Sequence, residues 1–393
     1  MTVTTERQSP ARTGFDPAPV PPAPPSESGQ DKRRSPLWAK LSLSFGVVLL
    51  VASGGGLAAG QTLISRSTES IAVTNLTGDA KKTVEEGGGS DLQGPIDLLL
   101  MGVDARARWA ADEVRADTII ILHIPASHDQ AYLVSVPRDT EVEVPAFAPS
   151  KYPGGTVKAT EAFYWGAQNG AGWAGGAQLL AKTLKNATGI SFDGAAIINF
   201  GGFKNVIDEL GGVKMCVDQQ VTSKHMVYVD GEPTYLAEAR KSGKAQKPVV
   251  HKVGCQDMEG WEALDYARQR YGLKNGDYDR QRHQQQLIKA MAKKAASGGL
   301  LDNPLKVSSL VQTAGKSLVL DVGDIEIADF VLGLKDVAAN DMVLLRTNGG
   351  TFAGNASGRE TLNDTTQAMF DAVKKDRLDQ FVLDNPGVVA NEK

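Results

Sequence analysis

The chain has 393 residues and a formal net charge of −4. This length suits one large domain or two modest ones. Because the chain as a whole has no basic bias, we expect no nucleic acid among its partners.

The N-terminal region predicts a membrane anchor. Residues 1–36 are rich in proline, serine and charge, which is typical of a disordered tail. The uncharged stretch from Leu41 to Ile64 has 24 residues, enough to cross about 30 Å of hydrocarbon as a helix. The basic residues Lys32 to Arg34 precede it, which indicates a cytoplasmic N-terminus. A cleaved signal peptide is the alternative, although a leader of about 40 residues is long for one. We therefore expect a single-pass protein of the cell membrane whose bulk is extracellular.

The remainder predicts an α/β domain. Apolar runs that are typical of buried strands occur at 96–103, 118–124, 131–136, 195–200, 213–217 and 342–346. Helical patterns occur at 161–168, 176–187, 203–210, 260–268 and 280–296. This alternation favours a three-layer α-β-α domain with a central mixed sheet, preceded by one transmembrane helix.

We expect six segments along the chain. In order, they are the disordered cytoplasmic tail 1–36, the transmembrane anchor 37–64, the flexible linker 65–93, the main domain 94–296, a C-terminal part 297–376 packed on or continuing that domain, and a flexible tail 377–393. The linker contains a glycine-rich run, which is a composition that keeps a chain flexible.

The two cysteines, Cys216 and Cys255, lie in the part expected outside the membrane, where disulfides persist. A bridge between them would close a loop of about 40 residues and stabilise the fold by roughly 3–4 kcal/mol. Two free buried thiols are the alternative, and no Cys/His spacing resembles a zinc site. We predict the disulfide.

Charged residues gather where the first three predicted strands begin or end. Asp104 and Arg106 follow the first strand, Arg115 and Asp117 precede the second, and Arg138 follows the third. In open α/β sheets, ligands bind beyond the carboxyl ends of strands. Arg115 and Asp117 point the same way in an extended chain. The alternative for each pair is a surface ion pair of little energetic value.

A second group of arginines lies more than 100 residues later. Arg268 and Arg270 follow one predicted helix, while Arg280, Arg282 and Gln284 open the next. Arg280 and Gln284 are four residues apart and share a helix face. Four arginines near one loop would repel one another without an anion, which favours a polyanionic ligand.

Two features beside these arginines have simpler interpretations. Asp277 and Asp279 precede the predicted helix at 280–296, where carboxylates cap a helix and favour its dipole. The run Gly170 to Gly175 matches G-x-G-x-x-G but follows no predicted strand, so we interpret it as a loop.

Arginines bind phosphate oxygens in a bidentate way and carboxylates hold Mg²⁺, so the charged groups together predict a pyrophosphate–metal site.

Taken together, the clusters resemble the LytR–CpsA–Psr family of bacterial cell-wall glycopolymer ligases, of the actinobacterial type. The resemblance covers about residues 94–296, which makes that segment the catalytic domain. The matching pieces are Gly102-x-Asp104-x-Arg106, Arg115-x-Asp117-Thr118, Ser135-Val-Pro137-Arg138-Asp139-Thr140, Gly201-Gly-Phe203 with Asp208-x-x-Gly211-Gly212-Val213, Ala263-Leu264-x-Tyr266-x-Arg268-x-Arg270, and Asp277-x-x-Arg280 with Gln284-Gln285.

The resemblance implies a phosphotransferase of cell-wall assembly. A polyprenyl-pyrophosphate-linked glycan would donate its glycosyl phosphate to a hydroxyl of peptidoglycan, and its lipid would lie in an apolar tunnel between sheet and helices. Asp104 and Asp117 would hold Mg²⁺ (or Mn²⁺). The residues assigned to the pyrophosphate are Arg106, Arg115, Arg138, Arg268, Arg270, Arg280, Arg282 and Gln284. The residues assigned to catalysis are Asp104, Arg115, Asp117, Arg138 and Arg270.

The chain departs from the family pattern at one position. His283 stands where the family has a second arginine, immediately before Gln284. Either Arg282 substitutes from a neighbouring helix face or the site tolerates less positive charge; a histidine can still donate to phosphate. The general base is left open among Asp104, Asp139 and a carboxylate near Arg280.

Two other functions use the same residues. A Mg²⁺-dependent pyrophosphatase would act on polyprenyl-pyrophosphate lipids with water as the acceptor. A non-catalytic binder would hold lipid-linked glycans without chemistry, but it would not need two carboxylates beside a dianion. We prefer the transferase.

Overall fold

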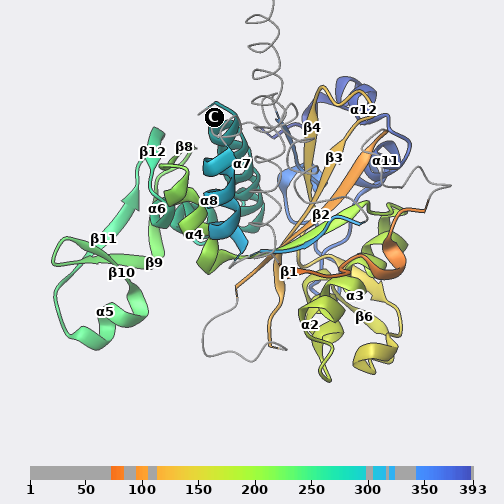
Figure 1. Ribbon diagram of the computed structural model, residues 1–393, viewed down its shortest axis with the longest axis horizontal. Helices are drawn as coiled ribbons and strands as arrows, with labels where there is room; N and C mark the ends of the chain where they lie inside the picture. The colour runs from red at the N-terminus through yellow and green to blue at the C-terminus, as the bar shows by residue number, and fades with distance from the viewer. Residues whose placement is uncertain are drawn as a thin grey trace, which may run out of the picture. The chain divides into compact units, whose positions relative to one another are not determined.

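The computed structural model describes residues 72–83, 94–104, 113–297, 304–315, 318–323 and 342–390 (Figure 1). The predicted tail 1–36, the anchor 37–64, most of the linker, and Arg106 lie outside the described residues. Among the residues that are described, no helix combines the length and the apolar composition needed to cross a membrane.

A seven-stranded mixed sheet forms the centre of the fold, as the sequence predicted. Its strand order is β1-β13-β7-β2-β3-β4-β14. The strands are β1 (Ala72–Val73), β2 (Ile96–Val103), β3 (Ala116–Ile124), β4 (Ala131–Ser135), β7 (Gly194–Asn199), β13 (Leu318–Asp321) and β14 (Met342–Leu345). Because β13 and β14 belong to this sheet, the chain beyond residue 297 continues the domain.

Strand direction places five strand ends together. β2 is parallel to β7 and antiparallel to β3, β3 is antiparallel to β4, and β4 is parallel to β14. Strands β2, β4, β7 and β14 therefore end, and β3 begins, at one edge of the sheet, which we call the carboxyl edge. Strand β3 starts two residues earlier than predicted, because its pairing with β2 continues through a bulge at Asp117.

Helices cover both faces of the sheet, which gives the expected three layers. On one face, Leu99 and Ile121 pack with Phe163 and Leu180 of α2 (Ala159–Ala167) and α3 (Gly172–Thr188). On the other face, Ile120 packs against α7 (Asp277–Ser297). The alternating apolar side chains of β2 and β3 thus feed two separate cores.

The remaining helices extend these layers. Helices α4 (Phe200–Glu209) and α6 (Gly260–Arg268) share a third core with α7, while α8 (Pro304–Gly315) follows α7 in the chain. Helix α11 (Asp364–Lys374) joins the core of α2 and α3. Residues 377–390, expected to be a flexible tail, instead form α12 (Leu378–Asp384) and the turn η5 (Pro386–Val388), because Leu378 and Val388 are buried in that core.

Several strands escaped prediction. The strands that were not predicted are β5 (Glu141–Val144), β6 (Gly155–Lys158), β9 (Val221–Val229), β10 (Glu232–Tyr235), β11 (Gln246–His251) and β12 (Gly254–Met258). Strand β8 (Val213–Val217), which was predicted, belongs with them. They form three small sheets, and the short helix α5 (Leu236–Ser242) follows β10. Their residues are mostly half-buried or exposed, so the apolar signal is weak.

The run Gly170 to Gly175 is a loop for two residues only. Helix α3 begins at Gly172, so the second half of the motif is helical, contrary to the prediction. A Cβ on Gly175 would lie 2.6 Å from the carbonyl oxygen of Gly166, and one on Gly166 would lie 2.4 Å from that of Gly175. These glycines therefore allow α2 and α3 to touch through their backbones.

Buried charged side chains attach the segment ahead of β2 to the rest of the domain. The carboxylate of Asp321 accepts hydrogen bonds from the backbone N–H groups of Leu76 and Thr77, at 2.8 and 3.0 Å. Further along, the ammonium of Lys82 lies 3.0 Å from Asp97 and 2.8 Å from Asp193. Burial opposes the charge on Lys82, but these two carboxylates outweigh it and raise its pKa.

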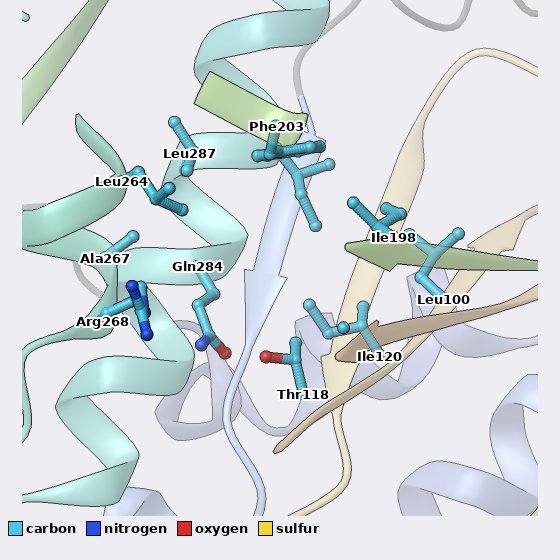
Figure 2. Close-up of a pocket in the computed structure, with 12 residues that line it drawn as sticks. Leu100, Thr118, Ile120, Ile198, Phe203, Leu264, Ala267, Arg268, Gln284 and Leu287 are labelled. Carbon is cyan, nitrogen blue, oxygen red and sulfur yellow. The ribbon is translucent and has the colours of Figure 1, made fainter. Parts of the chain in front are cut away.

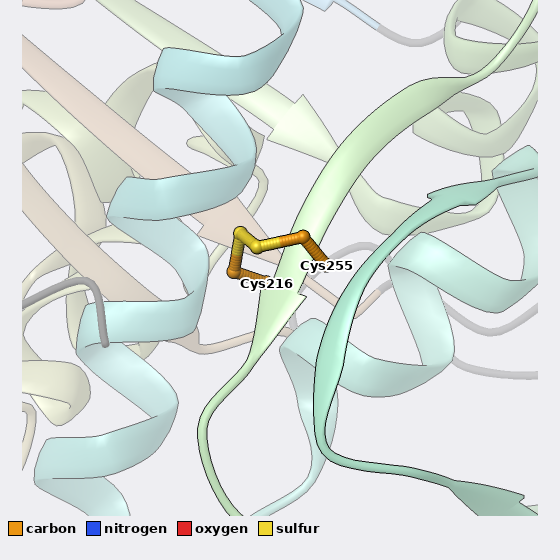
Figure 3. Close-up of a disulfide and its surroundings, with 2 residues drawn as sticks. All are labelled: Cys216 and Cys255. Atoms are coloured by element: carbon orange, nitrogen blue, oxygen red, sulfur yellow. A yellow bond between two sulfur atoms is a disulfide. The ribbon is translucent and has the colours of Figure 1, made fainter.

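Cys216 and Cys255 form the expected disulfide, which joins β8 to β12 (Figure 3). The two residues are directly paired in the antiparallel ladder. Asp218 and Gln219 follow β8 immediately, so the bridge also anchors the start of the loop that carries them.

Loss of this bridge should destabilise the fold without abolishing it. The cysteines are 39 residues apart, so their cross-link restricts the unfolded chain by about 4 kcal/mol. We expect a C216S/C255S variant to lose about that much free energy of unfolding in urea titrations. Non-reducing peptide mapping should recover the cross-linked peptide from the wild-type protein; two free thiols there, or an unchanged stability in the variant, would refute the bridge.

Candidate functional site

The carboxyl edge carries a row of acid–base pairs. Asp104 follows β2 directly, and Asp117 occupies the bulge in β3. A bulge changes the direction in which a side chain points, and bulges are common next to active sites. The Asp117 carboxylate accepts a 2.5 Å hydrogen bond from Nη1 of Arg138, which follows β4. Asp104 accepts one of 2.7 Å from Nη2 of Arg268, at the end of α6.

The first turn of α7 closes this row. Asp277 pairs with Nη2 of Arg280 at 2.8 Å and lies 3.8 Å from Nε of Arg138. Arg280 also donates to the carbonyl oxygen of Asp117 at 2.9 Å and is only 7% exposed. Asp277 is thus within the first turn rather than ahead of the helix, and it bridges two arginines that the sequence placed 142 residues apart.

Acidic partners offset the repulsion among the arginines. Burial opposes the charge on Arg138, but the carboxylates of Asp117 and Asp277 outweigh it and raise its pKa. The protein's own carboxylates thus neutralise part of this cluster, while burial and the neighbouring Arg138 and Arg270 lower the pKa of Arg280. The expected polyanionic ligand stays a prediction. These pairs are partly exposed, with 18–30% of each side chain accessible, and a ligand can reach them.

The other predicted arginines lie around this row. Arg270 donates to the hydroxyl of Tyr271 at 2.7 Å and stacks on its ring, which is 56% exposed. Arg115 stacks on the ring of Tyr164 from α2. Asp139, one of the possible bases, accepts a hydrogen bond from Lys158 at 2.9 Å.

An apolar groove opens beside the arginines. It lies between the sheet and α4, α6 and α7, and it holds about 440 Å³ of empty space including its open mouth (Figure 2). The residues that line it are Leu100, Gly102, Thr118, Ile120, Ile198, Phe203, Leu264, Ala267, Arg268, Gln284, Leu287 and Ile288.

Two of the residues that line this groove, Thr118 and Gln284, have polar side chains. Figure 2 shows the amide of Gln284 pointing toward the hydroxyl of Thr118. Gln284 Oε1 and Thr118 Oγ1 are both buried, and neither has a hydrogen-bond partner in the part of the chain that is described. Buried polar atoms are normally satisfied, so a ligand or water is expected there.

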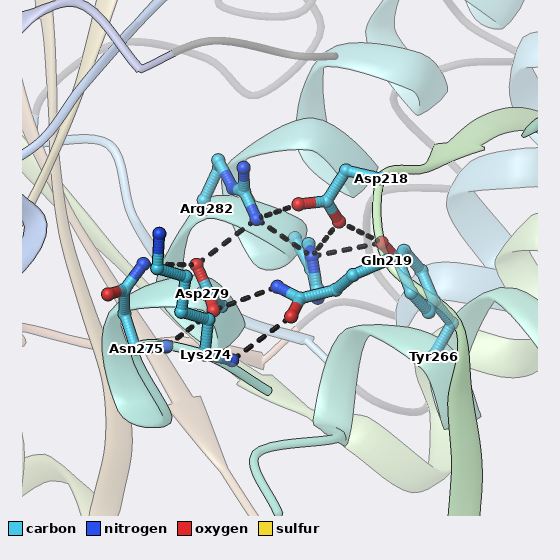
Figure 4. Close-up of polar contacts among 8 residues, drawn as sticks. Asp218, Gln219, Tyr266, Lys274, Asn275, Asp279 and Arg282 are labelled. Atoms are coloured by element: carbon cyan, nitrogen blue, oxygen red, sulfur yellow. Dashed lines mark hydrogen bonds and ion pairs between the residues drawn. The ribbon is translucent and has the colours of Figure 1, made fainter. Parts of the chain in front are cut away.

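Arg282 and His283 both contact Asp218 and belong to a separate network, in which Figure 4 labels Arg282, Asp218 and Tyr266. Asp218 accepts hydrogen bonds from Arg282 at 2.5 Å, from the ring of His283 at 3.0 Å and from the hydroxyl of Tyr266 at 3.1 Å. His283 is 1% exposed and stacks on Tyr266. Burial would raise the pKa of Asp218, but His283 and Arg282 lower it well below its usual range.

The same network holds the loop between α6 and α7. Asp279 accepts from the side chain of Gln219 at 2.9 Å and from the backbone of Asn275 at 2.8 Å. Gln219 accepts in turn from the backbone of Lys274 at 3.0 Å. The loop that carries Arg270 is thus fixed at its far end by residues adjoining the disulfide.

His283 should make stability depend on pH. Burial lowers its pKa below the ordinary value of 6.5, so the unfolded chain binds a proton before the folded chain does. Stability must therefore fall as pH drops below about 6.5, by up to about 1.4 kcal/mol per pH unit. We expect the stability of the wild type relative to His283→Gln, from urea titrations, to decline between pH 7.5 and 5. A difference that stays constant with pH would contradict this.

The Asp218 and Tyr266 contacts and the bridging role of Asp277 were missed from sequence. Tyr266 lies within the matched family motif, but nothing in its spacing indicates a contact with His283. Asp277 and Arg280 are spaced i, i+3, a spacing that indicates a salt bridge on a helix. The salt bridge was missed because Asp277 was interpreted as a helix cap.

Two carboxylates at the carboxyl edge are of the type that can hold a magnesium ion. Within the described ranges, no three His, Cys, Asp or Glu side chains gather into a metal cluster. Mg²⁺ commonly uses only one or two carboxylates and completes its octahedron with water and phosphate oxygens. Asp104 and Asp117, on neighbouring paired strands, supply such a pair.

The chain matches a known family. The LytR_cpsA_psr family model matches residues 62–378, so the chain belongs to the LytR_cpsA_psr family. The match extends beyond the predicted boundary at residue 296 and includes β13, β14 and α11.

Curated relatives carry names from cell-wall assembly. "Probable cell wall biosynthesis protein LcpB" of Corynebacterium glutamicum is 31% identical over 58% of this chain and 48% of its own length. "Cell wall biosynthesis protein LcpA" of the same organism is 28% identical over 86% of this chain and 64% of its own length. The chain therefore spans about half to two thirds of these two proteins. The polyisoprenyl-teichoic acid–peptidoglycan teichoic acid transferase TagT of Bacillus subtilis is 25% identical over 79% of this chain and 87% of its own length.

Solved structures share the mixed α/β fold. Protein gbs0355 of Streptococcus agalactiae aligns with a TM-score of 0.56 and 21% identity, over 73% of this chain and 88% of that chain. TagV of B. subtilis aligns with a TM-score of 0.53 and 20% identity, over 74% and 99%. The central mixed sheet is therefore a property of the fold family.

Proposed function

We propose that this protein is a membrane-anchored phosphotransferase. It transfers a glycosyl phosphate from a polyprenyl-pyrophosphate carrier to a hydroxyl of peptidoglycan. We call Arg138, Arg268 and Arg280 the arginine row. The observation that carries this proposal is that this row adjoins an apolar groove, because Arg268 belongs to the row and also lines the groove beside Gln284. The names of the relatives from cell-wall assembly support it.

The two parts of the site suit the two parts of such a donor. An isoprenoid chain gains free energy by leaving water for an apolar groove, at about 25 cal/mol per Å² of buried apolar surface. A pyrophosphate needs planar, charged donors, which Arg138, Arg268 and Arg280 provide. A nucleotide would need no apolar groove, and a simple lipid would need no arginines.

The chemistry follows from positioning and charge. The acceptor oxygen forms a bond to the glycan-bearing phosphorus while the bond to the bridging oxygen breaks, and polyprenyl phosphate leaves. The arginines neutralise the charge that shifts onto the leaving phosphate. The hydroxyl proton passes to a carboxylate at the carboxyl edge or to solvent. A magnesium ion held by Asp104 and Asp117 would polarise phosphoryl oxygens.

The proposal also includes where the protein lies in the cell. The stretch at 37–64 would anchor the chain in the cell membrane with its N-terminus in the cytoplasm, and the domain would act outside. Lipid-linked pyrophosphates are available there. Protease treatment of intact cells should remove the domain but spare an N-terminal tag; full protection of the domain would refute this arrangement.

A transfer assay tests the activity. The protein would be incubated with a defined polyprenyl-pyrophosphate glycan, with and without peptidoglycan, and both polyprenyl phosphate and the glycan–peptidoglycan linkage would be measured. Transfer to peptidoglycan supports the proposal. Release of polyprenyl phosphate at an equal rate without an acceptor would make the protein a pyrophosphatase, and tight donor binding without release would make it a binder.

A further inference from the structure

We propose that a second, polar groove at the carboxyl edge binds the acceptor glycan, an amino-sugar chain that carries carboxylates. This inference rests on the proposed function and assigns a place to its second substrate. The groove lies beyond the end of β14, between α11 and η5, and holds about 530 Å³ of empty space including its open mouth. Within the described ranges, no residue lines both this groove and the apolar groove.

The lining offers hydrogen-bond donors and one positive charge. Arg346 donates from Nε to the carbonyl oxygen of Gly387 at 2.9 Å, which fixes its guanidinium. Its two terminal nitrogens have no hydrogen bond or ion pair with any described residue. The oxygen of the Asn363 side chain accepts from Thr366, so its amide nitrogen is left to donate. The hydroxyl of Thr365 is exposed beside it.

These donors match a particular ligand chemistry. Sugar hydroxyls, acetamido carbonyls and carboxylates are all acceptors, and a guanidinium with two unengaged nitrogens suits a carboxylate. Among the described residues that line the groove, Arg346 is the one with a charged side chain. Met369 and Val388 add an apolar floor, as small-molecule sites commonly have. These polar groups make the groove unsuitable for a lipid chain.

The groove is placed to present its ligand to the arginine row. Strand β14 pairs with β4, and β4 pairs with β3. Asp117, Arg138 and Arg346 therefore come from three neighbouring strands at the carboxyl edge. Strands are about 4.8 Å apart, so β14 lies about 10 Å from β3. A sugar residue held at Arg346 can extend a hydroxyl toward the phosphate held at Arg138.

A buried hydrogen-bond network connects the groove to α7. The backbone of Asn348 donates to the hydroxyl of Thr366, which lines the groove, at 2.8 Å. The Asn348 side chain donates to the hydroxyl of Tyr278 at 3.0 Å, and Tyr278 donates to Glu360. Tyr278 follows Asp277, the residue that bridges the arginines. Buried hydrogen bonds thus link the groove to the helix turn that carries Asp277 and Arg280.

Kinetics of two groove variants would test the proposal. In Arg346→Gln and in Thr365→Val, we expect the KM for soluble peptidoglycan fragments to rise, by about 10- to 100-fold in the arginine variant. Release of polyprenyl phosphate without an acceptor, and the KM for the donor, should stay within about twofold of wild type. Arg240→Gln, an exposed arginine on α5, serves as the matched control.

Binding measurements separate this site from the proposed function. Wild-type protein should bind a carboxylate-bearing peptidoglycan fragment about tenfold more tightly than a neutral amino-sugar chain of equal length, and Arg346→Gln should lose that preference. This binding preference can be measured even if the protein shows no transfer, so the binding site and the proposed function are tested separately. An unchanged acceptor KM and preference in Arg346→Gln would overturn the proposal, as would equal loss of donor hydrolysis in both groove variants.

Discussion

Replacing Arg138 by alanine is expected to reduce transfer by about 10²- to 10³-fold in kcat, the usual cost of removing one donor that stabilises charge in the transition state. Arg138 is the centre of the row: it contacts Asp117 and lies near both Asp139 and Asp277. Arg138→Lys should recover only part of the rate, because lysine keeps the charge but lacks the planar fork. Initial rates with a lipid-linked donor would measure both.

The fold should survive this substitution. Asp277 keeps its ion pair with Arg280 and Asp139 keeps its ion pair with Lys158, so of these three carboxylates Asp117 alone loses its side-chain hydrogen bond. Thermal melting should therefore shift little. Arg377→Ala is a matched control, since Arg377 is exposed next to Asp376, which contacts His123 at the opposite end of β3. Full activity in Arg138→Ala would remove this residue from the site.

Withdrawal of divalent cations is expected to suppress transfer by about 10²- to 10³-fold, which corresponds to several kcal/mol of lost charge stabilisation. Added Mg²⁺ should restore it. Asp104→Asn and Asp117→Asn each remove one negative charge, so each variant should need at least about tenfold more Mg²⁺ for half-maximal rate. Titrations of Mg²⁺ against initial rate would measure this.

The magnesium requirement, rather than the maximal rate, is the informative readout. Each substitution also removes one carboxylate partner from an arginine, Arg268 or Arg138, and a purely structural effect of that kind would lower the rate at every Mg²⁺ concentration. Asp230→Asn, which breaks an exposed pair with Lys244, should behave as wild type. Turnover that ignores chelation would remove Asp104 and Asp117 from a metal role.

The central elements were predictable because their signals are local. The apolar run of β2 and the charged residues that follow it stand together in the sequence, and so do those of β4. The direction of a strand then decides which edge its terminal residues occupy. The convergence of Asp104, Asp117 and Arg138 could be expected on these grounds alone.

The pairings within the site could not be predicted in this way. Asp104 meets Arg268 across 164 residues, and Asp218 meets His283 across 65. Such contacts depend on how helices dock on the sheet, which no short pattern encodes. Polar strands such as β11 and β12 were missed for a related reason, since they lack the apolar alternation that identifies a strand.

The attachment of residues 72–82 has a mechanical consequence. A pull on the chain ahead of residue 72 would act on β1, which is parallel to β13, and next on the Asp321 hydrogen bonds and the Lys82 ion pairs. These contacts involve several residues and three carboxylates, those of Asp97, Asp193 and Asp321. We therefore expect tension along the N-terminal chain to be absorbed near this end of the sheet, leaving the spacing of the arginine row unchanged.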